Sequence, residues 1–402
     1  MKQRRSKLWS DEQAAAALPT AFFHAMQRWY QDHGRRLPWT GERDPYRVWL
    51  REIMLQQTTV VAVIPYLERF LNRFPDVTSL AQASLDDVLA LWSGLGYYRR
   101  ARHLHQTAVL IQQHYAGHFP DDLAVLQKLP GVGRYTAAAI AAFAFDRPVG
   151  LVETNTRRVY CRLAGYAGDP QSPAGQRWLW EWSEQLAQQA VSPDLHKRHF
   201  SGTAGDWHQA LMDLGAEICT PIQTRCQICP VEAWCMARHQ GRVGELPKLA
   251  PRPAMTARRE LALVFLRRSH RQRPPQHEVW LHQYAAGQRW AGLWDVPRFS
   301  LADQDDPAEV ARNKLQLLTD CPQLRLQPLP AQRYSITRYR VSVVVFRVLC
   351  LSKKSLEMNP SIDSHLSTQQ GWFPLSTCPQ LALTSPARSL LQRLRDEPLS
   401  LS

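Results

Sequence analysis

The chain has 402 residues and carries 49 Lys and Arg against 35 Asp and Glu, a formal net charge of +14. At roughly 100–200 residues per domain, that length predicts two or three domains, and 45% hydrophobic with 21% charged residues excludes a mainly disordered chain. The eight cysteines are too sparse for a disulfide scaffold, and we expect neither a membrane span nor a signal peptide, since no sufficiently long apolar run occurs. The positive charge favours a polyanionic partner.

Apolar residues in the first half of the chain recur at helical spacing. One set predicts a helix near the N-terminus, and a second set predicts a helix near residue 88. The small apolar run Ala137–Phe145 predicts a buried helix. The two periodic sets are Phe22, Met26, Trp29 and Tyr30, and Leu85, Val88, Leu89 and Trp92.

The segment Leu129–Thr136 reads Leu-Pro-Gly-Val-Gly-Arg-Tyr-Thr and directly precedes the predicted buried helix. Gly131 and Gly133, one residue apart, permit a tight turn with positive φ. They also leave backbone N–H groups accessible at the start of the next helix, where a phosphate can bind without base preference. The pattern alone is weak evidence, because any turn between two helices can use it.

Four cysteines show the spacing C-x6-C-x2-C-x5-C: Cys219, Cys226, Cys229 and Cys235. Four thiolates so close in sequence can hold one metal centre, either a tetrahedral zinc ion or an iron–sulfur cluster, and structural cysteines that bind nothing are the third alternative. A bound centre predicts a reducing, intracellular compartment. The other cysteines show no grouping and are expected to be buried and unliganded: Cys161, Cys321, Cys350 and Cys378.

The second half of the chain contains short runs rich in Val and Trp, which predict strands at Leu261–Leu266, Glu278–Leu281 and Val341–Leu351. Prolines and glycines gather in residues 241–255, and we interpret that segment as a linker. The sequence therefore predicts a helical part over residues 1–240 and a strand-containing part over residues 256–395.

Several stretches resemble the helix–hairpin–helix DNA glycosylases that carry a [4Fe–4S] cluster, and among them the MutY-type adenine DNA glycosylases. The resemblance is close over residues 20–240 and looser over residues 256–390. It implies an all-α core, with the hairpin at about 123–143 and the cluster loop at 219–235, followed by an α+β domain of Nudix-like fold. The stretches that carry it are Leu37–Trp39, Val48–Thr58, Gly94–Tyr98, Leu129–Thr136, Met212–Ala216 and the cysteine spacing.

The resemblance implies an enzyme that flips adenine out of duplex DNA and hydrolyses its N-glycosidic bond. Two carboxyl groups are needed, an acid that protonates the adenine ring and a carboxylate that faces the cationic sugar. Glu52 matches the acid, and its apolar neighbours predict a buried side chain. Glu153 lies where the family has an Asp, and Asn155 matches the residue that orients that carboxylate.

Two positions bear on the expected activity. Glu153 keeps the charge of the family's Asp but reaches about one methylene further, and a misplacement of about 1 Å can cost 10²-fold in rate. We expect activity to be retained, with a lesion-binding protein of weakened catalysis as the alternative. Tyr135 stands at the hairpin position where bifunctional relatives have the lysine that forms a Schiff base. The resemblance therefore implies a monofunctional glycosylase that leaves an abasic site.

The resemblance also assigns contacts with DNA. It implies that four residues surround the flipped adenine, two are wedged into the helix that the base has left, and two contact the opposite base. One family pocket position, an Arg directly after Leu-Pro-Trp, is Thr40 here. The assignments are Trp39, Leu55, Val60 and Gln209 for the adenine, Gln57 and Tyr97 for the wedge, Thr58 and Leu95 for the opposite base, and Gly131 and Gly133 for the phosphates.

In this family the C-terminal domain helps to recognise 8-oxoguanine opposite the adenine. Trp290–Pro297 fits the Gly-Leu-Trp segment of a Nudix-like domain, whereas Pro307–Thr319 offers Glu309 alone for the magnesium-binding box, so we expect no nucleotide hydrolase activity. The family's lesion-recognition loop should fall near Tyr334–Arg338, where Thr337 stands in for its serine and Arg338 replaces its histidine. Phosphate contacts by Arg338 and Arg340 are the alternative.

The expected partner is double-stranded DNA that holds adenine opposite 8-oxoguanine or guanine, bound by a monomer without contact to a membrane. A thymine or other mismatch glycosylase of the same superfamily is the second candidate.

Overall fold

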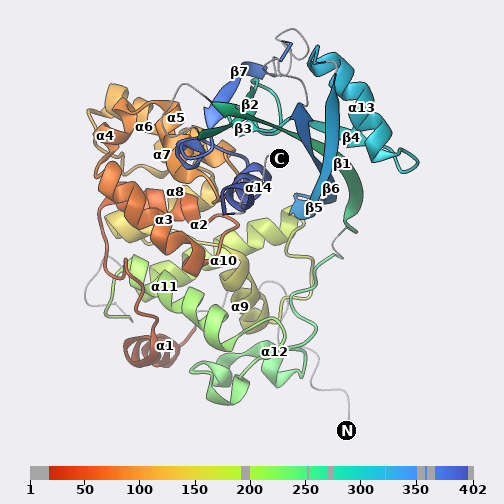
Figure 1. Cartoon of the computed structure of the whole chain (residues 1–402). Coiled ribbons are helices and arrows are strands. Elements are labelled where there is room, and N and C mark those ends of the chain that lie inside the picture. The colour runs from red at the N-terminus through yellow and green to blue at the C-terminus, as the bar shows by residue number, and fades with distance from the viewer. Residues whose placement is uncertain are drawn as a thin grey trace. The chain divides into compact units, whose positions relative to one another are not determined.

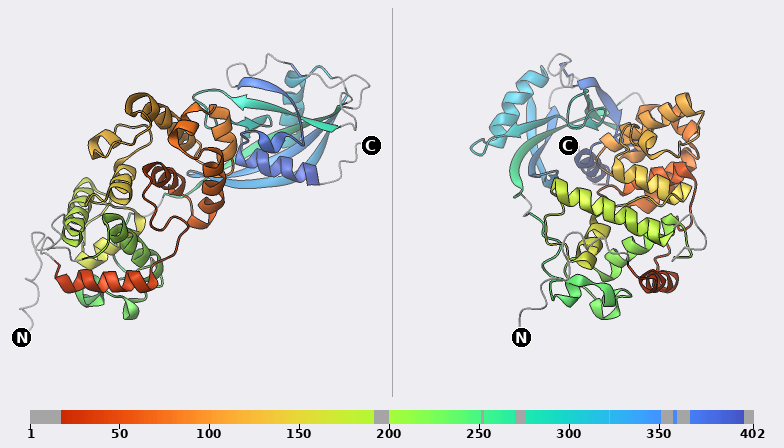
Figure 2. Two further views of the ribbon diagram at one scale, coloured as in Figure 1. Left: turned by 90° about the vertical axis from the view of Figure 1, so that its left-hand side faces the viewer. Right: turned by 180° about the vertical axis from the view of Figure 1, so that it is seen from behind.

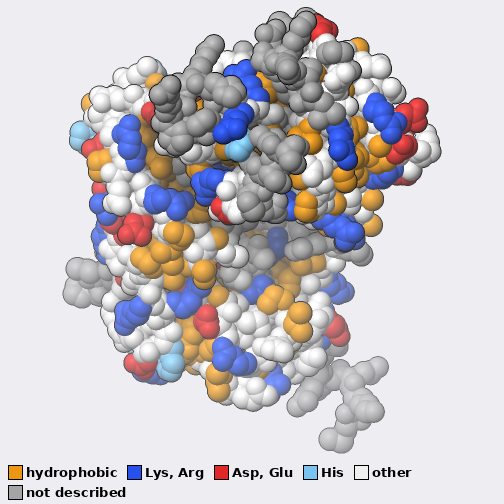
Figure 3. Space-filling view, viewed as in Figure 1, with side chains coloured by type: hydrophobic (Ala, Val, Ile, Leu, Met, Phe, Trp, Pro, Cys, Tyr) orange, Lys and Arg blue, Asp and Glu red, His pale blue; other side chains and the backbone are white. Residues whose placement is uncertain are grey.

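The computed structural model describes residues 18–191, 200–250, 253–269, 276–321, 323–350, 358–359 and 367–396. The chain divides into two compact units, Met1–Ala81 with Gln106–Pro251, and Gln82–His105 with Arg252–Ser402. The first unit is helical, and the second combines a sheet with helices (Figure 1). No helix of the described residues is both long and apolar enough to cross a lipid bilayer. On the face shown in Figure 3, Lys and Arg side chains are spread out rather than gathered in one patch.

The predicted helices are confirmed. The periodic set near the N-terminus lies in α1, the set near residue 88 coincides with α5, and Ala137–Phe145 lies in α8. The helices are α1 (Thr20–His33), α2 (Pro45–Leu55), α3 (Val60–Arg73), α4 (Val77–Gln82), α5 (Leu85–Trp92), α6 (Arg99–Tyr115), α7 (Leu123–Leu126), α8 (Arg134–Phe145), α9 (Thr154–Ala164), α10 (Pro173–Ala190), α11 (Ala204–Asp213) and α12 (Met236–His239), with a π-helical turn η3 (Leu214–Ile218) and 3-10 turns η4 (Cys226–Ile228) and η5 (Glu232–Trp234).

Aromatic side chains form much of the core of the first unit. Trp207 of α11 is fully buried, and its ring centroid lies 6.3 Å from that of Phe22 and 5.4 Å from that of Phe23, both on α1. The two helices pack against each other although they are far apart in the sequence (Figure 2). Tyr160 of α9 meets Trp182 of α10 edge-on at 5.6 Å. One core therefore holds α9 and α11, which carry several of the predicted site residues.

The second unit is built on a sheet with the strand order β3-β2-β1-β6-β5, in which β4 also pairs with β1 and β7 with β2. The β1–β6 pair is parallel and the other pairs are antiparallel. The three predicted strand runs lie in β1, β2 and β6, apart from Leu351, which is outside the described residues. The elements are β1 (Thr256–Ser269), β2 (Gln276–Tyr284), β3 (Trp294–Asp295), β4 (Arg298–Leu301), α13 (Pro307–Leu318), β5 (Leu324–Ile336), β6 (Tyr339–Cys350), β7 (Ser367–Pro374), η6 (Cys378–Gln380) and α14 (Ser385–Asp396).

Strand β1 is apolar on both faces because a helix covers each of them. Ala262 and Val264 belong to the core that includes Leu390 of α14, whereas Leu261 and Leu263 belong to the core that includes α13. Successive residues of a strand point to opposite faces, so a strand buried on both sides reads as a continuous apolar run. The helices α13 and α14 lie on opposite faces of the sheet (Figure 1). The C-terminal part is thus an α+β domain.

The structure differs from the predicted organisation in two segments. Residues 82–105, which the sequence analysis places in the helical part, group with the second unit. Within the predicted linker, Leu246 is buried, and its carbonyl accepts a hydrogen bond of 2.9 Å from Arg162 Nε. Residues 241–250 therefore belong to the first unit, residues 251 and 252 lie outside the described residues, and β1 begins at Thr256.

Candidate active site

A cavity of about 460 Å³ opens in the first unit, within the size range of ligand pockets. It lies where the turn after α2 meets the start of α8, the start of α9 and the face of α11. Ten of the predicted site residues line it: Glu52, Tyr135, Glu153, Asn155, Trp39, Leu55, Gln57, Thr58, Val60 and Gln209. No site role is predicted from the sequence for its other lining residues, which are Arg35, Leu37, Gln56, Thr154 and Met212.

Glu52 is 5% exposed, and each of its carboxylate oxygens has a hydrogen-bond donor. Tyr135 donates from its hydroxyl to Glu52 Oε2 at 2.8 Å, and Arg51 Nε donates to Oε1 at 3.2 Å. Arg51 is itself fixed by a hydrogen bond of 3.3 Å to the carbonyl of Trp39 and by the ring of Phe143 beneath its guanidinium. These contacts hold the carboxyl group in one position at the cavity wall.

Tyr135 is a neutral donor in this arrangement. Burial raises the pKa of its hydroxyl well above the usual range, and the adjacent charge of Glu52 raises it further. The residue lies in the first turn of α8, directly after the turn formed by Gly131, with φ of +72°, and Gly133, which precedes the helix without a side-chain cap. The hairpin places Tyr135 at the cavity, whereas the two glycines lie outside its lining.

Glu153 begins α9 through a reciprocal capping box. The backbone N–H of Thr156 donates to Glu153 Oε1 at 2.8 Å, and the backbone N–H of Glu153 donates to Thr156 Oγ1 at 2.9 Å. Burial raises the pKa of the Glu153 carboxyl, which the N–H groups of Asn155 and Thr156 and the charges of Arg158 and Arg157 partly offset. The longer side chain is thus tied to its own helix start and still lines the cavity.

Asn155 is connected with the cysteine loop through Arg158. One amino group of Arg158 donates to Asn155 Oδ1 at 2.9 Å and to the carbonyl of Gly215 at 2.6 Å, and its Nε donates to the carbonyl of Cys219 at 2.6 Å. Gly215 is required at its position, because a Cβ atom there would lie 2.7 Å from the Cβ of Asn155. Arg158 could not be predicted as a site residue, because its sequence surroundings give no local signal.

Gln209 of α11 is fixed by a buried carboxylate. Asp213 has no exposed surface and accepts a hydrogen bond of 2.8 Å from Gln209 Nε2. Arg35 donates to the same carboxylate from its backbone N–H at 2.9 Å and from Nε at 2.8 Å. With Nε2 engaged, Gln209 Oε1 is the atom that can accept a hydrogen bond from the amino group of a ligand.

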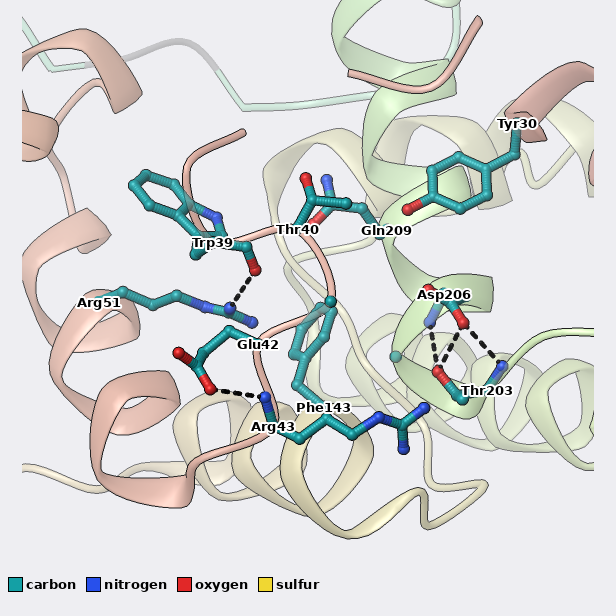
Figure 4. Close-up of a pocket in the computed structure, with 12 residues that line it drawn as sticks. Tyr30, Trp39, Thr40, Glu42, Arg43, Arg51, Phe143, Thr203, Asp206 and Gln209 are labelled. Atoms are coloured by element: carbon teal, nitrogen blue, oxygen red, sulfur yellow. Dashed lines mark hydrogen bonds between the residues drawn. The ribbon is translucent and has the colours of Figure 1, made fainter. Parts of the chain in front are cut away.

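A smaller pocket adjoins the cavity and shares Trp39 and Gln209 with it (Figure 4). Thr40, at the position where the family has an Arg, lines this pocket, and its hydroxyl accepts a hydrogen bond of 2.9 Å from the backbone N–H of Leu37. Thr40 therefore stabilises its own turn.

Several predicted contact residues lie in turns and loops, and three of them have positive φ. Gln57 is exposed in the turn between α2 and α3, with φ of +58°. In the second unit Leu95 is buried, Tyr97 is 50% exposed with φ of +49°, and Thr337 is exposed in the turn between β5 and β6 with φ of +50°. Leu95, Tyr97 and Thr337 belong to the second unit, and the cavity is lined by the first unit alone.

The four grouped cysteines line one pocket on the first unit, together with Arg162 and Arg238. Arg162 Nη1 lies 3.4 Å from Cys219 Sγ. All four thiols are partly buried and free of disulfides, and no group of three or more His, Cys, Asp or Glu among the described residues is arranged around a single metal ion. Of the ungrouped cysteines, Cys161 and Cys378 are buried as predicted, the prediction is wrong for the partly exposed Cys321, and the side chain of Cys350 lies outside the described part.

The chain is similar in sequence to known DNA repair proteins. Residues 50–185 match the HhH-GPD superfamily of base excision DNA repair proteins. The adenine DNA glycosylase of Mus musculus is 37% identical over 359 residues, which cover 78% of this chain and 66% of the mouse protein. That of Buchnera aphidicola subsp. Schizaphis graminum is 34% identical over 279 residues, which cover 69% of this chain and 75% of that protein.

The match is partial for the longer relatives. It covers 66%, 44% and 40% of the mouse, rat and human proteins, so this chain spans less than two thirds of the length of these mammalian relatives. A mutT/nudix family protein from Listeria innocua matches 36% of this chain and 94% of its own length, with 15% identity and a TM-score of 0.27.

Proposed function

We propose that this chain, which belongs to the adenine DNA glycosylase family, hydrolyses the N-glycosidic bond of adenine in double-stranded DNA, where the adenine lies opposite 8-oxoguanine or guanine. The observation that carries the proposal is a single cavity lined by the hydrogen-bonded pair of Glu52 and Tyr135 and by Glu153. These are the two acidic groups that the reaction needs, and both belong to the first, helical unit.

The positions of the side chains suggest different catalytic roles for the two carboxyl groups. Glu52, as the acid, gives a proton to a ring nitrogen of the flipped adenine, and the base leaves with the electron pair of the glycosidic bond. The sugar becomes cationic, and the carboxylate of Glu153 stabilises that charge. Water then adds to the sugar carbon and loses a proton, which leaves an abasic site. Asn155 and the helix start of α9 hold Glu153 in place.

Recognition of adenine is assigned to the side chains around these carboxyl groups. Gln209 Oε1 accepts from the exocyclic amino group, because Gln209 Nε2 is engaged by Asp213. Trp39, Leu55 and Val60 supply the apolar surface against which a purine ring stacks. The phosphate contacts are assigned to the backbone at Gly131 and Gly133, which lies open at the start of α8.

The activity is tested in a single-turnover assay with three duplexes, which hold A opposite 8-oxoguanine, A opposite G and T opposite G. We expect cleavage of the A strand only after alkali treatment, since no lysine is found among the described residues that line the cavity and a tyrosine forms no Schiff base. Strand cleavage without alkali would contradict the monofunctional assignment. Intact A strands, with processing of the T strand, would favour the thymine glycosylase instead.

We also propose that Cys219, Cys226, Cys229 and Cys235 hold a [4Fe–4S] cluster. Four thiols around one pocket match the ligand set of such a cluster. Arg162 and Arg238 line the same pocket, and their positive charges suit a group that carries anionic thiolates. When bound, the cluster ties the cysteine loop into one unit, and Arg158 and Arg162, which reach the loop from α9, orient it.

The cluster is tested by the colour of the purified protein. We expect a brown protein with iron and sulfide in a ratio of about 4 to 4, and we expect Cys229→Ser to lose the visible absorption and to unfold at a lower temperature. Cys321→Ser is the matched control, because Cys321 lies in the second unit with its side chain partly exposed, and it should change neither property. A colourless protein with one equivalent of zinc would contradict the proposal.

The C-terminal α+β part is assigned as a Nudix-like domain that reads the base opposite the adenine. Thr337 lies in the exposed turn between β5 and β6, where it replaces the family's serine, and its hydroxyl donates to the carbonyl of Ile336 at 2.7 Å, which leaves the oxygen able to accept. Arg338, in place of the histidine, directs its guanidinium toward the hydroxyl of Tyr339 at 3.1 Å. Glu309 is the one acidic residue of helix α13. One carboxylate is too few for a magnesium-binding box, which supports a domain that does not hydrolyse nucleotides.

We propose that the protein acts as a monomer within the cell.

A further inference from the structure

The loop Gly94–Tyr97 of the second unit has a strained backbone. Gly94 and Gly96 have φ of +101° and +75°, and Tyr97 has φ of +49°. A bulky residue with positive φ is rare, and such strain persists only where the surroundings fix the backbone. Tyr97 is nevertheless half exposed, so the strained residue presents its ring to the solvent rather than to a core.

One side of the loop is held by its neighbouring helices. Trp92 of α5 donates from its indole N–H to the carbonyl of Gly96 at 3.0 Å. Arg100 of α6 donates to the same carbonyl at 3.2 Å, and its guanidinium lies 5.3 Å from the ring centroid of Trp92 and 5.4 Å from that of Tyr97. These contacts fix the end of the loop at Gly96 and Tyr97, whereas Gly94 and the preceding residue Ser93 are held by other groups.

The other side is tied to the C-terminal domain through one carbonyl oxygen. The hydroxyl of Tyr98 donates to the carbonyl of Leu383 at 2.9 Å and accepts from the backbone N–H of Gly94 at 3.1 Å. The hydroxyl of Ser93 donates to the same carbonyl at 2.9 Å, and Arg388 Nε of α14 donates to Ser93 Oγ at 3.1 Å. Ser93 and Tyr98 are 5% and 7% exposed, so these bonds are shielded from water.

We propose that Tyr98 and Ser93 are positioning residues through which the C-terminal domain sets the conformation of the Gly94–Tyr97 loop. In addition to recognising the base opposite the adenine, the domain holds Tyr97 in one orientation before DNA binds. A loop with two glycines would otherwise have to be ordered at the moment of binding, and preorganisation removes that cost. The effect on excision rests on the proposed function, whereas the effect on the loop itself does not.

Tyr98→Phe tests this role, since it removes one hydroxyl and keeps the ring. We expect the single-turnover excision rate to fall by roughly 10-fold, within the range for a mispositioned group, and the amide protons of Gly94–Tyr97 to exchange faster in the free protein. Tyr46→Phe is the matched control, because its buried hydroxyl likewise donates to a backbone carbonyl, that of Phe74 at 2.7 Å. Tyr46→Phe should lower the melting temperature about as much as Tyr98→Phe does. It should leave the excision rate and the exchange rates of the Gly94–Tyr97 amide protons unchanged.

A double-mutant cycle separates positioning from general destabilisation. If Tyr98 acts through Tyr97, Tyr98→Phe should cause no further loss of rate in a Tyr97→Ala background, and Ser93→Ala should behave in the same way. Equal losses in both backgrounds, or unchanged loop amides in Tyr98→Phe, would overturn the inference. If the wild-type protein excised no adenine while the loop amides of Tyr98→Phe exchanged faster, the proposed function would fail and the role of Tyr98 in the loop would stand.

Discussion

Replacing Glu52 by glutamine is expected to lower the rate of adenine excision by roughly 10²- to 10⁴-fold, the contribution of a positioned general acid. Glutamine has nearly the same shape but has no carboxyl proton to give to the departing base. It also disturbs the local hydrogen bonds, because Glu52 accepts one from Tyr135 and one from Arg51, and a neutral amide can accept through its oxygen alone. The loss should therefore appear in the chemical step, with binding of the duplex largely retained.

The measurement is a single-turnover rate with adenine opposite 8-oxoguanine, combined with the affinity for the same duplex. Glu278→Gln is a suitable control, since the same chemical change breaks an ion pair of 2.7 Å with Arg267 in the second unit. It should reduce stability slightly and leave the rate intact. A Glu52→Gln protein whose rate stays within about threefold of wild type, far below the usual contribution of such an acid, would show that Glu52 is not the acid.

Glu153→Gln should cause the second large loss, by roughly 10²-fold or more, because it removes the negative charge that faces the cationic sugar. The glutamine oxygen can still accept the hydrogen bond from Thr156, so α9 should keep its start. Asp206→Asn is the matched control, since Asp206 and Thr203 form the capping box of α11. A rate near that of wild type for Glu153→Gln would mean that another group stabilises the sugar.

The pH dependence of the rate gives a second readout for Glu153. Burial raises the pKa of its carboxyl above the usual range of a glutamate. The reaction needs the anion, which is lost as the pH falls through that raised pKa, so the rate should begin to fall at a higher pH than an exposed glutamate would cause. Glu153→Gln should lack this acidic limb. Glu153→Asp restores the family's residue, and an increase in rate would indicate that the longer side chain weakens catalysis.

Much of the helical unit could be predicted from local sequence signals. The apolar spacing of Phe22 and Met26 located α1, and the run Ala137–Phe145 located α8, because burial of one helix face or of a whole helix leaves a periodic or continuous apolar pattern. The turn at Gly131 and Gly133 was equally readable, since its backbone conformation favours glycine.

The partners of the site residues could not be predicted in this way. No local signal distinguishes Arg51 and Arg35 from arginines on a solvated surface. Their positions are fixed by residues distant in the chain, since Arg51 is held by the carbonyl of Trp39 and the ring of Phe143, and Arg35 by Asp213. The grouping of residues 82–105 with the C-terminal domain also arises from contacts distant in the chain, among them the hydrogen bonds from Tyr98 and Ser93 to the carbonyl of Leu383.

Five non-glycine residues of the described chain have a left-handed backbone conformation, and they fall into two groups. Ala116 and Asp146 directly follow helix ends, where this conformation is common. Gln57, Tyr97 and Thr337 occupy turns or loops in which glycine or asparagine would suit the backbone better. Each conformation costs on the order of 1 kcal/mol of folding stability. Replacing any one of these three residues by asparagine should therefore raise the stability of the folded protein, and it would at the same time remove a side chain for which a contact with DNA is proposed.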